Sequence, residues 1–88
     1  MKIKGQYILR EVAGEIVAIS VGETVLNSNV LIALNESGKF FWELMTKDLT
    51  EDEIVAAVCD EYEIDEETVR RDLNEFADYL RLNKVEVE

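Results

Sequence analysis

The order of hydrophobic and polar positions divides the chain into a strand-like first third and a helical remainder. Residues 7–12 and 15–21 are rich in β-branched and aromatic side chains, and Ala13-Gly14 between them predicts a two-residue hairpin. A third apolar run, VLIAL at residues 30–34, lies between two asparagines and predicts a third strand. Neither of the first two strands has a fully polar face, so we expect both faces to be partly covered.

Three helices follow, and each has a recognisable first residue. Asn35 is placed to cap a helix that carries Glu36 in its first turn. Thr50 and Glu53 have the spacing of a capping box, and Asp65 can cap a third helix that ends near Asn83. The side chains expected on the inner stripes of these helices are Phe40, Phe41, Leu44, Met45, Ile54, Val55, Val58, Cys59, Tyr62, Val69, Leu73, Phe76, Ala77 and Leu80.

The element order predicts the fold class. Three short strands need helices to cover one face of their sheet. We therefore expect a single α+β domain over residues 1–88, winged-helix-like, with a three-stranded antiparallel sheet followed by three helices. Only Glu63 and Ile64 separate the second helix from the Asp65 cap, as in a tight helix-turn-helix. Residues 85–87 either add a short terminal strand or fray.

The composition argues against catalysis. The chain has no histidine, which removes the commonest general base and the commonest metal ligand. The one cysteine, Cys59, has helical spacing from Val55 and Tyr62, and we interpret it as a buried thiol rather than a nucleophile. We expect no enzyme activity, no metal and no cofactor.

The charge is strongly uneven. The first 47 residues carry five acidic and five basic side chains, whereas residues 48–88 carry fifteen acidic and four basic ones, so the whole net charge of −11 lies in the helical part. Such a surface repels phosphate backbones and disfavours nucleic acid. It either attracts a basic partner or only keeps the protein in solution. No apolar run approaches the ~20 residues of a membrane span, and no signal peptide is visible, so a cytoplasmic protein without membrane contact is expected.

Three segments carry a resemblance to a known family. They are YILREVAGEIVAISVGE at residues 7–23, LNESGKFFWELM at 34–45, and LTEDEIVAAVCDEYEIDEETVRRDLNEFADYLRLNKV at 49–85. The chain resembles the PqqD-like proteins, the recognition elements for ribosomally synthesised and modified peptides. The turn into the first helix, LNESG followed by FWEL, is the most specific marker. The stretch Asn27-Ser28-Asn29 departs from many relatives, which have a bulkier or glycine-containing turn there.

The resemblance implies a non-catalytic function. Relatives bind the leader segment of a precursor peptide and present it to a modifying enzyme, often a radical S-adenosylmethionine enzyme. The leader adds as a further strand to the third strand and lies in a groove between that strand and the third helix, here residues 29–34 and 69–80. Strand addition agrees with general physics, since an unpaired edge offers backbone donors and acceptors.

Within these segments we expect different roles for neighbouring side chains. Val30, Ile32 and Leu34 are expected to pack inward, whereas Leu31 and Ala33 alternate with them and are candidates for the groove. A slip of one residue would exchange these roles. The candidate peptide-binding residues are Asn29, Val30, Leu31, Ile32, Ala33, Leu34, Arg70, Arg71 and Tyr79.

Arg70, Arg71 and Tyr79 are the candidates on the third helix. The two arginines either balance the surrounding acids or offer one guanidinium to an acidic leader residue. Tyr79 lies at the edge of the inner stripe, where a ring can be buried while its hydroxyl stays wet.

Two other functions fit the predicted fold. A winged-helix DNA-binding regulator would have this outline, but its recognition helix would here be acidic, with only Arg70, Arg71 and Arg81 as bases. A non-catalytic scaffold subunit of a complex is the other alternative. The leader-binding module is the leading hypothesis.

Overall fold

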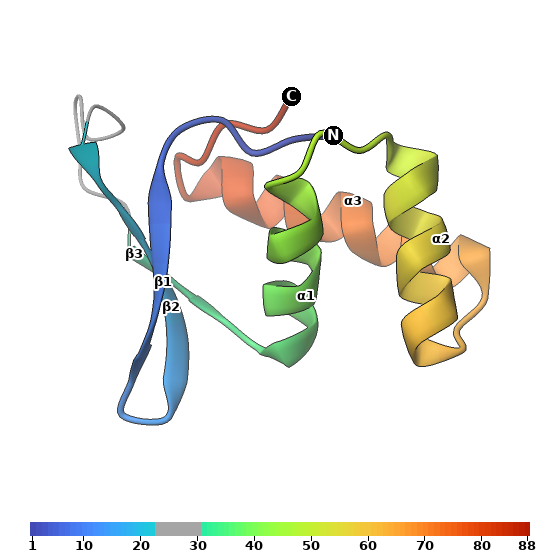
Figure 1. The fold of residues 1–88 in the computed structure, drawn as a ribbon, viewed down its shortest axis with the longest axis horizontal. Helices are drawn as coiled ribbons and strands as arrows, with labels where there is room; N and C mark the ends of the chain where they lie inside the picture. Colours follow the sequence, from blue (N-terminus) through green and yellow to red (C-terminus); the bar gives the residue numbers. More distant parts are fainter. Residues whose placement is uncertain (23–30) are drawn as a thin grey trace.

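A hairpin and a third strand form a sheet at one side of the molecule, and three helices follow them in the chain (Figure 1). The computed structural model describes residues 1–22 and 31–88. The elements are β1 (Tyr7–Val12), β2 (Glu15–Ser20), β3 (Leu31–Leu34), α1 (Glu36–Met45), α2 (Glu51–Tyr62) and α3 (Glu66–Leu82). The predicted fold class and element order are therefore confirmed. Asn29 and Val30 lie outside the described residues.

The sheet is antiparallel in the order β1-β2-β3. Ala13 and Gly14 form the predicted two-residue turn, and both have positive φ, 52° and 83°. Positive φ at both central residues is the geometry that matches the twist of a tight hairpin. The turn fixes the register, so that Val12 lies opposite Glu15 and Tyr7 opposite Ser20.

The three helices begin where the sequence predicts. The Asn35 side chain accepts a hydrogen bond from the Gly38 amide at 2.7 Å. Thr50 and Glu53 form the reciprocal capping box, with hydrogen bonds of 2.9 and 3.1 Å. Asp65 accepts from the Thr68 amide at 3.0 Å, and this hydrogen bond is the main reason why the pKa of Asp65 lies below its usual value. Each cap satisfies amides that the helix itself leaves unpaired.

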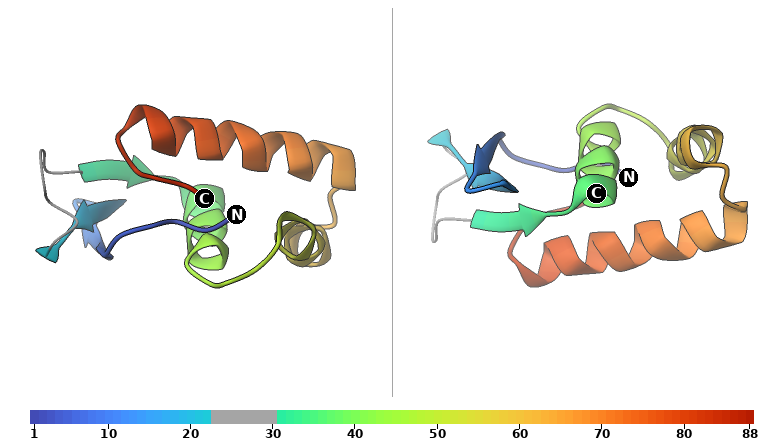
Figure 2. Two further views of the ribbon diagram at one scale, coloured as in Figure 1. Left: turned by 90° about the horizontal axis from the view of Figure 1, so that it is seen from above. Right: turned by 90° about the horizontal axis from the view of Figure 1, so that it is seen from below.

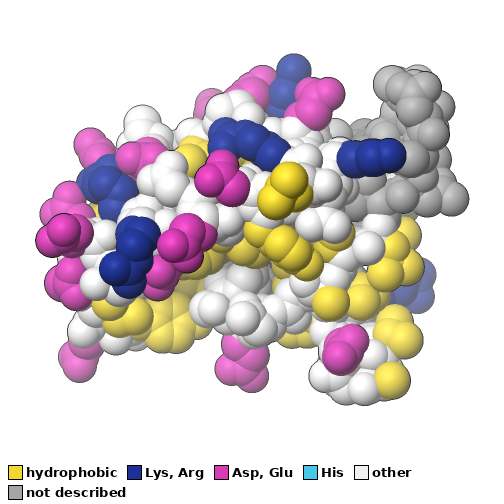
Figure 3. Space-filling model, turned by 180° about the vertical axis from the view of Figure 1, so that it is seen from behind, with side chains coloured by type: hydrophobic (Ala, Val, Ile, Leu, Met, Phe, Trp, Pro, Cys, Tyr) yellow, Lys and Arg dark blue, Asp and Glu magenta, His cyan; other side chains and the backbone are white. Residues whose placement is uncertain are grey.

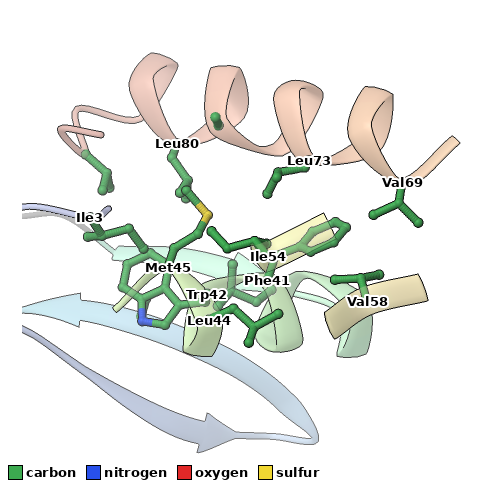
Figure 4. Packing of buried hydrophobic residues seen from close by; sticks show 14 of the residues in the cluster. Ile3, Phe41, Trp42, Leu44, Met45, Ile54, Val58, Val69, Leu73 and Leu80 are labelled. Carbon is green, nitrogen blue, oxygen red and sulfur yellow. The ribbon is translucent and has the colours of Figure 1, made fainter. Parts of the chain in front are cut away.

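The core lies between the sheet and the three helices. Val69, Leu73 and Leu80 project from α3 toward Met45 and Ile54 (Figure 4). Figure 2 shows from two directions that β3 lies between the β1–β2 hairpin and α3. No helix in the described ranges has the length and apolar character of a bilayer span.

Cys59 is a correction to the sequence analysis, because its thiol is only partly buried. Val55 and Val58 occupy the inner face of α2, with exposed fractions of 2% and 3%, and Cys59 and Tyr62 lie at the margin of this face. Cys59 packs against the core as a partly buried apolar side chain.

The chain ends pair with each other. Ile3 and Val87 form an antiparallel bridge, and the Lys2 and Glu88 backbones exchange hydrogen bonds of 3.2 and 2.8 Å. Of the two possibilities for residues 85–87, the structure has the paired one. Val85 is 1% exposed, so this tail closes the core beside the end of α3.

The packing makes a direct prediction for Leu73, which is fully buried. We expect Leu73→Ala to lower the free energy of unfolding by about 2–5 kcal/mol, because it leaves a cavity that the helices cannot close fully. The neighbouring exposed substitution Glu67→Ala should change it by less than about 0.5 kcal/mol. Urea denaturation of the two variants measures both values, and equal costs would contradict this position of the core.

Candidate functional site

The candidate site begins at the edge of β3, and the hairpin determines which backbone groups that edge presents. Because Val12 and Glu15 close a two-residue loop, they form a hydrogen-bonded pair, and such pairs alternate along an antiparallel ladder. The backbone groups of Val17 and Ile19 therefore face β1. Those of Ile16 and Ala18 face β3.

The same alternation continues into β3. Ile16 lies opposite Leu34 and Ala18 opposite Ile32, so these pairs carry the β2–β3 hydrogen bonds. The N–H and C=O groups of Leu31 and Ala33 consequently point away from β2. Among the described residues β3 has a strand neighbour on one side only, so these groups form a sheet edge.

Tyr79 on α3 reaches this edge. Its hydroxyl donates a hydrogen bond of 3.1 Å to the Ala33 carbonyl, which agrees with the direction derived from the ladder. The ring is 40% exposed and contacts the Phe76 ring, with centroids 6.2 Å apart. Tyr79 therefore links α3 to β3 across the space between them.

The side chains of β3 alternate as predicted. Ile32 and Leu34 are 4% and 7% exposed, whereas Leu31 is 66% exposed and Ala33 is also exposed. The inward orientation of Ile32 and Leu34 is confirmed. The side chains of Leu31 and Ala33 project from the sheet face opposite to the core. Only the backbone groups of these two residues therefore face the edge beside α3.

A cavity of about 330 Å³ opens where β3 ends. Its wall includes Asn35, which directly follows β3, and Phe76, which contacts Tyr79. A Cβ at Gly38 would approach Phe76 Cε1 to 3.2 Å, so a glycine there lets α1 lie close against this ring. The remaining lining comes from all three helices and the α2–α3 link: Ser37, Gly38, Phe41, Val58, Tyr62, Ile64, Val69, Asp72 and Glu75.

The two arginines of α3 differ in their surroundings. Arg70 contacts carboxylates of Glu51, Asp52 and Glu66 at 2.7–3.0 Å, and these contacts hold the pKa of its guanidinium above its usual value. Arg71 is two-thirds exposed and has one longer contact, 3.7 Å, to Asp72. Arg70 thus joins α3 to the start of α2 with its donors engaged.

Arg70 also lies on the wrong side of α3 for the β3 edge. Tyr79 follows it by nine residues, about two and a half helical turns, so the two side chains project from opposite sides of the helix. The structure brings Tyr79 to Ala33, and Leu31 lies two residues before Ala33 on the same strand edge, but Arg70 projects away from them. Arg71 projects between the two sides, closer to that of Tyr79.

The surface around the site is apolar along a band and acidic beside it. Figure 3 faces α3 and shows hydrophobic side chains across the molecule, with acidic and basic side chains above the band and toward the α2 end. Residues 1–22 and 31–88 contain no cluster of three potential metal ligands.

Comparison with known proteins identifies the family. The family model described as coenzyme PQQ synthesis protein D (PqqD) matches residues 15–85. The chain belongs to the PqqD family. A solved structure described as TbiB1 in complex with the TbiA(beta) leader peptide is similar to this PqqD-family chain, with a TM-score of 0.75, 30% identity, and coverage of 98% of this chain and 95% of that one. No curated protein sequence matches the chain.

The family membership expected from the sequence is therefore confirmed. Sequence reasoning missed the cavity beside β3. The sequence predicts Tyr62 on the inner stripe of α2 and Ile64 only in the link between α2 and α3, yet both line the cavity and are 44% and 39% exposed. The one feature of the sequence that points to this cavity is Ile64, an apolar residue in the two-residue link between α2 and α3. Glu63 ends α2 with a positive φ of 52°, a backbone turn that sequence periodicity does not reveal.

The arginine geometry predicts unequal effects on stability. Arg70→Gln should lower the melting temperature, because it removes the cation that three carboxylates share, and a network of charges contributes more than a single exposed pair. Arg71→Gln, which removes the same charge, should change it little.

Thermal melts at about 20 mM and 500 mM salt test this difference. The loss in Arg70→Gln should shrink at high salt, where exposed charges are screened. Equal melting temperatures of the two variants at low salt would contradict the assigned role of Arg70.

Proposed function

We propose that this PqqD-family chain binds the leader segment of a ribosomally synthesised precursor peptide by strand addition to β3. The observation that carries the proposal is the edge itself: Leu31 and Ala33 turn their backbone donors and acceptors toward α3 instead of β2. An extended peptide satisfies such groups with its own amides. The similarity to a protein solved with a leader peptide supports this choice of ligand.

Presentation to an enzyme is the second part of the proposal. The chain itself acts as a non-catalytic module, and a separate peptide-modifying enzyme carries out the chemistry, with a radical S-adenosylmethionine enzyme as one candidate. The absence of histidine from the whole sequence supports a binding role over catalysis. The leader would bring the core peptide to that enzyme without any bond being made or broken here.

The acidic helices argue against the DNA-binding alternative. The net charge of −11 opposes the phosphate contacts that supply most nonspecific DNA affinity. In α3, Arg70 is engaged by three carboxylates, which leaves few donors for phosphates. Nothing specific favours a purely structural scaffold over peptide binding.

The site predicts which amides respond to peptide. A leader peptide encoded by a precursor gene beside the gene for this chain should shift the Leu31 and Ala33 amide resonances and slow their hydrogen exchange, because each amide gains a strand partner. Amides of the Ala13-Gly14 turn serve as the internal control. If the largest changes occurred at this turn, the assigned edge would be wrong.

Tyr79 separates the contributions of ring and hydroxyl. Tyr79→Ala should weaken leader binding by about 1–2 kcal/mol, as for an interfacial aromatic anchor. Tyr79→Phe keeps the ring and frees the Ala33 carbonyl for a leader amide, so it should bind at least as tightly as wild type. Calorimetric titration gives these affinities, and a Tyr79→Phe loss as large as that of Tyr79→Ala would show that the hydroxyl is the anchor instead.

Arg71 tests whether an acidic leader residue contacts α3. Its exposed guanidinium has one long contact, so Arg71→Ala should weaken binding by about 0.5 kcal/mol at low salt and by less at 500 mM salt. Arg81→Ala, farther along α3, is the matched control. Wild-type affinity of Arg71→Ala at low salt would remove Arg71 from the site.

A further inference from the structure

The cavity at the end of β3 has a composition that the strand-addition model does not explain. Its interior is formed by apolar and aromatic side chains, including Phe41, Val69 and Phe76. The charged residues that line it are both acidic, Asp72 and Glu75 on α3. A neutral apolar peptide segment could be buried in the apolar interior, but the two carboxylates would add nothing to its affinity.

The cavity wall includes Asn35, the residue that directly follows β3. A strand advances about 3.3 Å per residue, so a peptide paired with Ala33 passes Asn35 after about two residues and reaches the cavity mouth. Aromatic contacts mark the same path, since Phe76 contacts both Tyr79 and Phe41, with ring centroids 6.2 and 5.6 Å apart.

Two residues that line the cavity, Asn35 and Tyr62, have further contacts with α1. Asn35 caps α1 through the Gly38 amide at 2.7 Å. Tyr62 contacts the Phe40 ring edge-on, with centroids 5.4 Å apart. A volume of about 330 Å³ has room for one aromatic or large aliphatic side chain.

We propose that this cavity is a specificity site for an apolar leader side chain that is followed or preceded by lysine or arginine. The proposal rests on leader binding at the β3 edge and adds the chemistry of one position beyond it. The apolar side chain fills the interior, and its basic neighbour lies at the rim beside Asp72 and Glu75. Arg71 does not line the cavity, but its guanidinium lies 3.7 Å from the Asp72 carboxylate and partly offsets the negative charge of the rim.

Small probes test the cavity without any leader peptide. Phenethylamine, phenylacetamide and phenylacetate share a phenyl ring and differ in charge, being cationic, neutral and anionic at pH 7. Titration followed by ¹⁵N chemical shifts should give millimolar binding, with shifts at Ile64, Val69 and Phe76. We expect the cation to bind about three- to tenfold more tightly than the anion at low salt, and this preference to fade at 500 mM salt.

Two matched double variants test whether Asp72 and Glu75 cause the preference for the cationic probe. The double substitution Asp72→Asn and Glu75→Gln should remove the preference for the cation and keep phenylacetamide binding unchanged. Asp60→Asn with Glu61→Gln changes the net charge equally on exposed α2 positions away from the cavity and should keep it. No probe binding at these amides, no cation preference in wild type, or an equal loss in both double variants would each overturn the proposal. Because no leader is used, such a result leaves strand addition at β3 to be judged by its own titration.

Discussion

The unpaired edge of β3 is the constraint on which the rest of the site depends. Backbone N–H and C=O groups withheld from water need partners, and a sheet edge leaves them available. In this chain the hairpin turn at Ala13-Gly14 sets the phase of the ladder, and this phase directs the Leu31 and Ala33 groups outward. The Tyr79 hydroxyl already takes one acceptor, the Ala33 carbonyl.

Helix α3 turns this edge into a site by lying beside it. Val69, Leu73, Ala77 and Leu80 fix the helix on the core, and Arg70 ties its first half to α2 through three carboxylates. These contacts lie on one side of the helix, which leaves the side with Phe76 and Tyr79 facing β3 and the cavity. Stability and binding therefore use largely different sides of the helix, and Val69, which is buried in the core and also lines the cavity, lies where the two sides meet.

The sequence predicted those parts of the fold that depend on local chemistry. Caps at Asn35, Thr50 and Asp65 are read from neighbouring residues, and so is the two-residue hairpin. The inward orientation of Ile32 and Leu34 followed from period-two alternation. Cys59 was misassigned because helical spacing alone does not show how wide a buried stripe is.

The site was less predictable because it is formed between elements. Tyr79 could be placed at the margin of a stripe, but its contact with Ala33 joins residues 46 positions apart. Charge composition alone made Arg70 and Arg71 equivalent. The structure distinguishes them, because Arg70 contacts three carboxylates and projects from the side of α3 opposite to Tyr79, whereas Arg71 has one longer contact. The cavity is lined by Tyr62 and Ile64 on either side of Glu63, whose positive φ no helical pattern indicates.

The most direct test of strand addition at β3 is an N-methyl scan of the leader peptide, read by calorimetric titration. N-methylation removes one backbone donor at a time, and in a paired strand alternate amides face the neighbouring strand. Strand addition predicts a large loss of affinity at every second position over the segment that pairs with Leu31–Leu34, and little loss at the positions between. Equal losses along the segment, or losses that repeat every three to four residues as for a bound helix, would contradict it.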